Sequence, residues 1–223
     1  MQKKTSPKLF IDLSTPIGRF AILVLMAGIF SLYFPINQAW GTVHSFKLPI
    51  DDQLPIVSEF VIVYVFGFFG WGAAYVLWTL WRLPKAYLRF MLAMLFAVVM
   101  AYIIYLSYQS TVPRPDLEVQ NGFDQILKWV YGQGRRYNSF PSGHTYTTVI
   151  LLLSTLTIVR NRYWRAFFIV LGLSIILSTV LLKQHYVLDP LAGIVVASFA
   201  WWLSGQAISY VYPVNPEQKN LPQ

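Results

Sequence analysis

Six apolar stretches free of charged side chains constrain this chain more than any other feature of its sequence. Crossing the hydrocarbon core of a bilayer, about 30 Å thick, takes about 20 helical residues. We interpret six stretches as membrane spans, in chain order Phe20–Phe34, Phe60–Trp81, Phe90–Tyr108, Thr145–Val159, Ala166–Leu182 and Leu191–Tyr212. The fourth and fifth are short, so we expect their ends to lie near the membrane interface.

The spans are expected to be helices, because lipid offers the backbone no hydrogen-bond partners. A membrane β-barrel would show short strands of alternating polarity, whereas these stretches are continuously apolar. The predicted fold class is therefore all-α, an integral membrane six-helix bundle. It forms one domain over residues 16–212, between a tail at 1–15 and a tail at 213–223. No small-x-small cleavage site follows Phe34, so the first helix is expected to be retained rather than removed as a signal peptide.

Composition supports lipid as the solvent of most of the chain. Charged residues make up 12% of it, against about 25% in soluble domains, and 56% of the residues are hydrophobic. This excludes a disordered chain, a soluble basic protein with a nucleic-acid partner and, with no cysteine, a disulfide scaffold. Eleven of the 17 Lys and Arg residues fall on one side of the predicted topology, with two acidic residues. The positive-inside rule therefore places both termini and the 160–165 loop in the cytoplasm.

The two large outer loops differ in content. Residues Pro35–Pro55 contain Pro and Trp but no obvious chemistry. The loop Gln109–Pro141 is longer, and apolar residues recur in it at helical spacing, at Phe123, Ile126, Leu127 and Val130. Gly132 and Gly134 would end that helix. We interpret it as a short interfacial helix on the membrane surface, with a substrate lid as the alternative.

Three polar clusters contain the residue types that catalysis requires. Arg114 and Pro115 follow the third span, residues 138–144 lead into the fourth, and residues 183–189 connect the fifth to the sixth. Spans three and five end outside and span four begins outside. The topology alone therefore places all three clusters at the same membrane face.

Each cluster has a physical use. Ser142 after Pro141 is typical of a helix N-cap, and the first amides of that helix, at Gly143 and beyond, are suited to bind an anion such as phosphate. Arg114 supplies a planar, charged fork for phosphate oxygens. Asp189, expected to cap the sixth helix with Pro190 at its first position, has a carboxylate that could hold the ring of a nearby histidine.

The chain has three histidines, and two of them are candidates for catalysis. His144 and His185 lie in the outer clusters, and an imidazole held by a carboxylate beside a free imidazole suits a nucleophile with a general acid/base. His44 lies in the first outer loop without a suitably spaced acidic neighbour, and we interpret it as structural. A metal site built from the two histidines and Asp189 is disfavoured, since cysteine and HExxH-type spacing are absent. No metal or other cofactor is expected.

Together, these clusters resemble the motifs of the type-2 phosphatidic acid phosphatase superfamily, which includes lipid phosphate phosphatases, glucose-6-phosphatases and vanadium haloperoxidases. The family pattern is K-x6-R-P, then P-S-G-H, then S-R-x5-H-x3-D. The chain has Arg114-Pro115, then Pro141-Ser142-Gly143-His144, then Ser178 with His185 and Asp189. The resemblance covers about residues 15 to 210. It implies a nucleophile at His185, an orienting carboxylate at Asp189 and a general acid/base at His144. It implies phosphate binding by Arg114, Ser142 and Gly143.

Two positions depart from the family pattern. Ser107 replaces the first lysine and Thr179 replaces the arginine of the third motif, and both lost groups bind phosphate in the family. Lys183 lies four residues after Thr179, one helical turn along the same face. We therefore predict that Lys183 restores the missing phosphate-binding charge, with Arg135 or Arg136 as further candidates.

The resemblance implies a metal-independent hydrolase of lipid metabolism that acts on a membrane lipid phosphate or pyrophosphate. Polyprenyl pyrophosphate, phosphatidate and phosphatidylglycerophosphate all fit the expected site. The alternatives are a lipid phosphotransferase with an alcohol acceptor and a lipid-binding relative without activity. A transporter is disfavoured, because the spans contain almost no ionisable residue at mid-membrane depth. We expect a bacterial plasma membrane with the active site on the non-cytoplasmic face; an endoplasmic reticulum protein with a lumenal site would share these features.

Overall fold

The computed structural model describes residues 13, 15–134 and 136–211, and within them the regular secondary structure is helical, with no strands. The elements in chain order are α1 (Pro16–Ser31), α2 (Tyr33–Ile36), α3 (Pro49–Gln53), a 3-10 turn η1 (Ser58–Phe60), a π-helical turn η2 (Val63–Gly67), α4 (Phe68–Arg82), α5 (Pro84–Ser107), α6 (Gly122–Gln133), α7 (Gly143–Ile158), α8 (Arg162–Leu181) and α9 (Leu188–Val211). The predicted all-α fold is confirmed. Most of both predicted tails, and Arg135, lie outside the described residues.

Among the described residues, five helical segments are long and apolar enough to cross a membrane: Pro16–Ile36, Ser58–Arg82, Pro84–Ser107, Arg162–Leu181 and Leu188–Tyr210. The predicted count of six is not confirmed. The predicted fourth span corresponds to α7, whose 16 residues reach only about 24 Å. The predicted shortness of the fifth span is wrong, since α8 has 20 residues. Arg162 and Arg165 lie in its first turn, so the charge-free stretch that predicted this span begins only after them.

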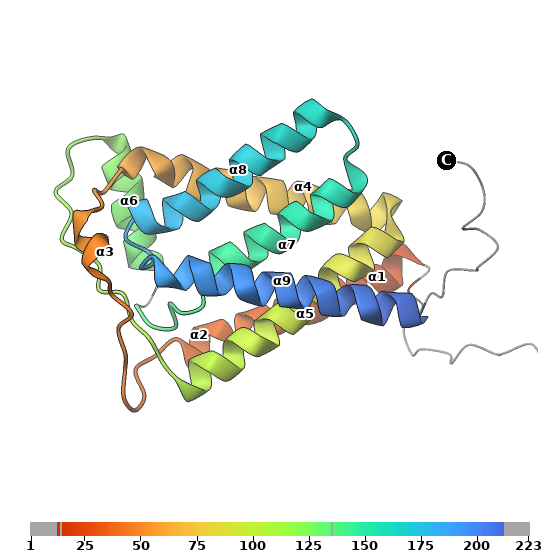
Figure 1. Cartoon of the computed structure of the whole chain (residues 1–223), viewed down its shortest axis with the longest axis horizontal. Helices are drawn as coiled ribbons and strands as arrows, with labels where there is room; N and C mark the ends of the chain where they lie inside the picture. Colours follow the sequence, from red (N-terminus) through yellow and green to blue (C-terminus); the bar gives the residue numbers. More distant parts are fainter. Residues whose placement is uncertain (1–12, 14, 135, 212–223) are drawn as a thin grey trace, which may run out of the picture.

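The long helices lie side by side and alternate in direction (Figure 1). α5 lies among them and packs against α1, α4, α7 and α9. Ala93, Ala97 and Ala101 are fully buried on one face of α5, and Ala197 and Ala200 are fully buried on α9. Small side chains let helices approach closely, which drives their packing in lipid. α5 begins at Pro84, earlier than predicted, because its charged first turns are accommodated: the Arg89 guanidinium lies 3.8 Å from the Trp201 ring centroid.

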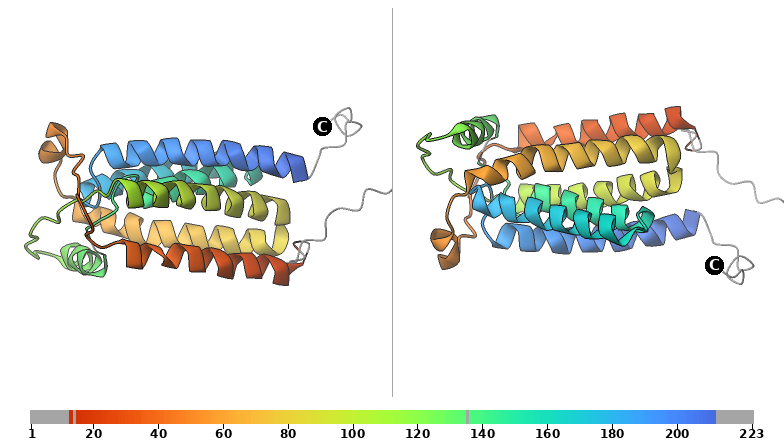
Figure 2. Two further views of the ribbon diagram at one scale, coloured as in Figure 1. Left: turned by 90° about the horizontal axis from the view of Figure 1, so that it is seen from below. Right: turned by 90° about the horizontal axis from the view of Figure 1, so that it is seen from above.

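Two short helices, α3 and α6, lie at one end of the bundle, where α7 and α9 begin (Figure 2). The predicted helix between the third and fourth spans is confirmed as α6, which Asn121 caps by accepting from Phe123 N and Asp124 N. Its Leu127 is fully buried against Val61, Tyr64 and Leu182. α6 therefore packs on the end of the bundle as well as presenting exposed apolar side chains on its outer side.

Candidate active site

His185 lies in the turn between α8 and α9, beside a carboxylate in the first turn of α9. Its Nδ1 is 3.2 Å from Asp189 Oδ2, and Asp189 is fully buried. Asp189 Oδ2 also accepts a hydrogen bond from Tyr186 N at 3.1 Å. Asp189 was expected to be the cap of this helix, but α9 begins at Leu188, so Asp189 lies in its first turn. Its carboxylate holds the imidazole through Nδ1 and leaves Nε2 for a substrate.

The residues before α7 are bonded directly to this histidine–carboxylate pair. Ser142 N donates to the Asp189 carbonyl at 3.0 Å. Ser142 is the N-cap of α7, as predicted, and its Oγ accepts from Thr145 N at 3.3 Å and from Thr145 Oγ1 at 3.1 Å. At Gly143 an added Cβ would lie 3.7 Å from Tyr146 Oη, an ordinary contact. The two motifs thus meet through the backbone.

His144 lies in the first turn of α7 among aromatic rings. Its ring centroid lies 6.4 Å from that of His185, 4.4 Å from that of Tyr64 and 4.8 Å from that of Phe68. A hydrogen bond of 3.3 Å joins His144 Nδ1 and Tyr64 Oη. The structure therefore brings together the two candidate catalytic histidines, which come from separate sequence motifs.

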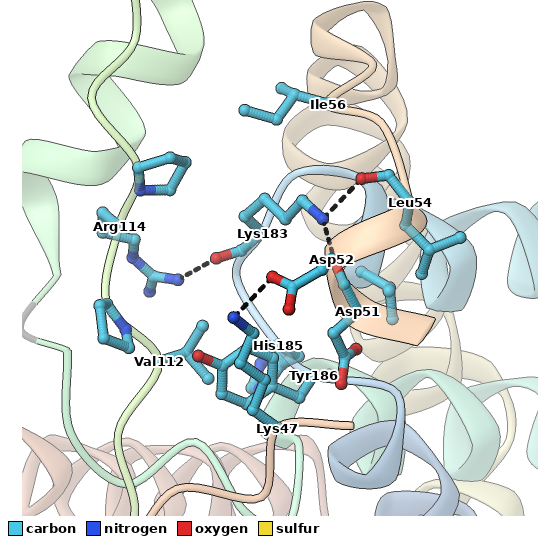
Figure 3. A pocket seen from close by; sticks show the side chains of 13 residues that line it. Lys47, Asp51, Asp52, Leu54, Ile56, Val112, Arg114, Lys183, His185 and Tyr186 are labelled. Carbon is cyan, nitrogen blue, oxygen red and sulfur yellow. Dashed lines mark hydrogen bonds and ion pairs between the residues drawn. The ribbon is translucent and has the colours of Figure 1, made fainter. Parts of the chain in front are cut away.

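A cleft of about 500 Å³ opens beside His185 (Figure 3). Its lining consists of Lys47, Asp51, Asp52, Leu54, Ile56, Val112, Pro113, Arg114, Pro115, Val180, Lys183, His185 and Tyr186. Three cationic side chains thus line a cleft that also contains the imidazole. Ser142, Gly143 and His144 are not among the lining residues.

Arg114 lines the cleft and has one donor that none of the described groups uses. Its Nη1 donates to the Lys183 carbonyl at 2.8 Å, whereas its buried Nε has no hydrogen-bond partner among the described residues. The guanidinium carbon lies 5.6 Å from the ring centroid of Tyr131. Burial lowers the pKa of Arg114, but a guanidinium keeps its charge in proteins. A buried, unpaired N–H on a cation is suited to bind an anion.

Lys183 reaches the cleft in a different way from the one predicted. α8 ends at Leu181 and Lys183 has a φ of 49°, so it does not continue the helical face of Thr179. That face argument is wrong, although Lys183 still lines the cleft. Its Nζ donates to the carbonyls of Asp51 and Leu54, both at 2.7 Å.

Among the described residues, the two substituted family positions and Arg136 are not part of the cleft lining. Ser107 Oγ donates to the Ile103 carbonyl at 2.7 Å. Thr179 is buried, and its carbonyl accepts from Gln184 N and His185 N. Arg136 is exposed outside the cleft, and Arg135 lies outside the described residues.

The first outer loop, predicted to have no chemistry, forms one wall of the cleft. Asp51 Oδ1 accepts from Val187 N at 2.9 Å, which ties α3 to the turn that carries His185. Asp52 pairs with Lys47 at the rim. Pro49 followed by Asp51 is a helix-start pattern, so the sequence could have indicated α3 but not its distant contact. His44, interpreted as structural, stacks on Tyr108 with 3.8 Å between the ring centroids, and it does not line the cleft.

Metal-ligating groups are not clustered here. Within the part of the chain that the structure describes, no three His, Cys, Asp or Glu side chains lie close enough to hold a metal ion.

Comparison with known families gives one match. A profile of the PAP2 superfamily matches residues 86–213, from the start of α5 to the end of α9. Comparison with curated proteins and with solved structures gives no significant match. The matched range exceeds half of the chain and contains Arg114, the Ser142–His144 segment and the His185–Asp189 pair. On this evidence, the chain belongs to the PAP2 superfamily of type-2 phosphatidic acid phosphatases, and this membership supports a phosphatase kind of reaction.

Proposed function

We propose that this protein is a membrane lipid phosphate or pyrophosphate phosphatase that acts through a phosphohistidine at His185. The observation that carries the proposal is the 3.2 Å contact from His185 Nδ1 to the buried Asp189, in a turn that borders a cationic cleft. An imidazole with Nδ1–H held by a carboxylate has its Nε2 lone pair free to attack. The family match supports a phosphoryl-transfer reaction of this kind.

In the first step, His185 Nε2 attacks phosphorus and the bond from phosphorus to the leaving oxygen breaks. Asp189 stabilises the positive charge that forms on the imidazole. Arg114 and Lys183, with the Ser142 hydroxyl and the Gly143 amide, hold the phosphate oxygens, because positioning and electrostatic stabilisation carry most of such transfers. His144 gives its proton to the leaving oxygen.

In the second step, water replaces the lipid oxygen. His144, now neutral, takes a proton from water while the water oxygen attacks phosphorus, and the bond from phosphorus to His185 Nε2 breaks. Phosphate leaves and both histidines return to their starting protonation states. No metal ion takes part in either step.

A lipid substrate is supported by the position of the cleft at one end of an apolar bundle. Large apolar side chains, such as Phe69, Trp78 and Val195, are exposed along the helices where lipid tails would contact them. A head group in the cleft would leave its acyl or prenyl chain beside the bundle. Polyprenyl pyrophosphate, phosphatidate and phosphatidylglycerophosphate belong to this class. We place the site on the non-cytoplasmic face of a bacterial plasma membrane, with both termini in the cytoplasm.

A lipid phosphotransferase is the second candidate. Ser107 and Thr179 stand where the family pattern has basic residues, and the superfamily includes phosphotransferases as well as phosphatases. In that reaction an alcohol replaces water in the second step. Product analysis with an added alcohol distinguishes the two.

The test is phosphate release by the detergent-purified protein in EDTA. The substrates are phosphatidate, phosphatidylglycerophosphate and undecaprenyl pyrophosphate, and the comparison variant is His185→Ala. We expect release from at least one lipid that survives EDTA and is lost in the variant. His44→Ala is the matched control, because His44 lies outside the cleft, and its activity should equal that of the wild type. Release that persists in His185→Ala would refute the assignment.

A further inference from the structure

Tyr64 contacts His144 from a part of the chain that the family profile does not include. It lies in the π-helical turn Val63–Gly67, whereas the match begins at residue 86. Tyr64 and Phe68 are four residues apart, so they lie on the same helical face, and both rings contact His144. π-helical turns occur frequently at functional sites.

The geometry gives each catalytic histidine its own partner at Nδ1. His185 has the Asp189 carboxylate, and His144 has the Tyr64 hydroxyl at 3.3 Å. We propose that Tyr64 is a positioning residue of the proposed reaction: its hydroxyl accepts a hydrogen bond from His144 Nδ1–H, so that Nε2 alone exchanges protons with the leaving group and with water. The contact is long, as such bonds often are in the absence of substrate. This inference rests on the proposed function.

The Tyr64 hydroxyl affects which nitrogen of His144 holds the proton at each step. In the imidazolium form of His144, Nδ1–H donates to Tyr64 Oη and Nε2–H faces the leaving oxygen. After proton transfer the ring is neutral with its proton still on Nδ1, so the Nε2 lone pair is ready to accept a proton from water. Without the hydroxyl the neutral ring can hold its proton on Nε2, and that tautomer cannot act as the base.

Apolar side chains pack around Tyr64. Its side chain is 6% exposed and packs with Val61, Leu127 and Leu182, so α6 covers the tyrosine that contacts His144. The titratable or charged groups near His144 are Tyr64 itself, His185 and Arg114. A phenol at Nδ1 thus orients the ring without placing a further charge in a site that already contains a guanidinium.

The test compares Tyr64→Phe with Tyr87→Phe in the full-length, detergent-purified protein. Tyr87 is also fully buried, and its hydroxyl donates to the Arg19 carbonyl at 2.8 Å, far from the cleft, so Tyr87→Phe is a matched loss of one hydroxyl. We measure kcat and KM for phosphatidate between about pH 4 and pH 9, a range that starts below the usual histidine region because burial, with His185 and Arg114 nearby, lowers the pKa of His144. The His144 limb is the one on which kcat falls as pH rises, because His144 must be protonated to give its proton to the leaving oxygen, and His144→Ala tests whether that ring is needed.

We expect Tyr64→Phe to lower kcat about tenfold to a hundredfold, by analogy with the loss of the hydrogen bond that orients a metal-ligating imidazole. KM should stay within about twofold, and the His144 limb should shift. Tyr87→Phe should match the wild type. Should Tyr64→Phe not fold, a fluorinated tyrosine at position 64 retains the hydroxyl but makes it a weaker acceptor, and the same limb must shift.

Two results overturn the inference in distinguishable ways. If His144→Ala is inactive while Tyr64→Phe keeps wild-type kcat and pH profile, Tyr64 has no positioning role and the proposed function stands. If His144→Ala itself keeps full activity, the proposed role of His144 fails, and the inference fails with it.

Discussion

The two histidines of the site lie 6.4 Å apart between ring centroids, yet the protein holds them by opposite means. His185 lies in a turn and is bonded to a fully buried carboxylate. His144 lies on a helix and contacts two aromatic rings, the phenol of Tyr64 and the ring of Phe68. A carboxylate stabilises an imidazolium, which suits the ring that becomes phosphorylated, whereas a phenol orients the ring without adding charge. Differences in environment thus assign different roles to identical side chains.

Removing each ring gives the largest expected effects and tests whether the roles differ. His185→Ala should lower turnover at least about a thousandfold, and His144→Ala about a hundredfold to ten-thousandfold. With radiolabelled phosphatidate quenched in alkali, which preserves phosphohistidine, His144→Ala should still label and His185→Ala should not. The chain contains no cysteine, so labelled thiols do not confuse the assay. Equal loss of labelling in both variants would contradict the division of roles.

Asp189→Asn should sharpen the comparison with a somewhat smaller effect. The amide keeps the shape of the side chain but removes the charge that stabilises the phosphorylated imidazole of His185. We expect kcat to fall about a hundredfold with little change in KM, measured by phosphate release from phosphatidate. Asp52→Asn is the matched control, because this carboxylate lies at the rim and pairs with Lys47. Wild-type kcat in Asp189→Asn would show that the carboxylate does not act on the nucleophile.

Gly193 on α9 keeps the two histidine segments in contact. An added Cβ there would lie 2.9 Å from Thr145 Cβ and 3.0 Å from the Ser142 carbonyl, too close for either to remain in place. Gly193→Ala should therefore separate α9 from the start of α7, destabilise the fold by about 1–3 kcal/mol and lower kcat about tenfold. Thermal unfolding and phosphate release measure the two effects.

The matched control for that substitution is Gly28→Ala, where an added Cβ meets nothing within 4 Å. It should leave the unfolding temperature and the activity at wild-type levels or raise stability slightly. Wild-type behaviour of Gly193→Ala would mean that the α7–α9 contact does not set the spacing of the site.

Local patterns in the sequence were sufficient to predict several features of the structure. Charge-free stretches located the helices, and their alternation placed Arg114, His144 and His185 at one end. Ser142 after Pro141 indicated the cap of α7, which is confirmed. Charged first turns were missed at α5 and α8, because Arg89 and Arg165 interrupt an apolar stretch without interrupting the helix.

The remaining features depend on contacts between residues that are distant in sequence. Tyr64 in an apolar stretch carries no local sign of its contact with His144, 80 positions away. Asp51 contacts Val187 across 136 positions, so the role of the first outer loop was not predicted. The prediction for Lys183 assumed that the helix continues past Leu181, whereas the backbone turns there. Lys183 lines the cleft as predicted, but not for the predicted reason.

Lys183→Met should give the smallest effect. It tests the environment of His185, the histidine that lies in a turn. Lys183 Nζ donates to the carbonyls of Asp51 and Leu54, so two of its three N–H donors are used and one remains for phosphate. We expect KM for phosphatidate to rise about threefold to tenfold with a smaller change in kcat. Lys47→Met removes another cation from the same cleft without loosening the turn that carries His185, so its effect on KM should be weaker. A fall in kcat at constant KM would instead mean that Lys183 stabilises the turn that carries His185, through its hydrogen bonds to the carbonyls of Asp51 and Leu54. His144 lies on a helix, whose own backbone hydrogen bonds hold it in place. Unchanged kcat and KM would remove Lys183 from the site.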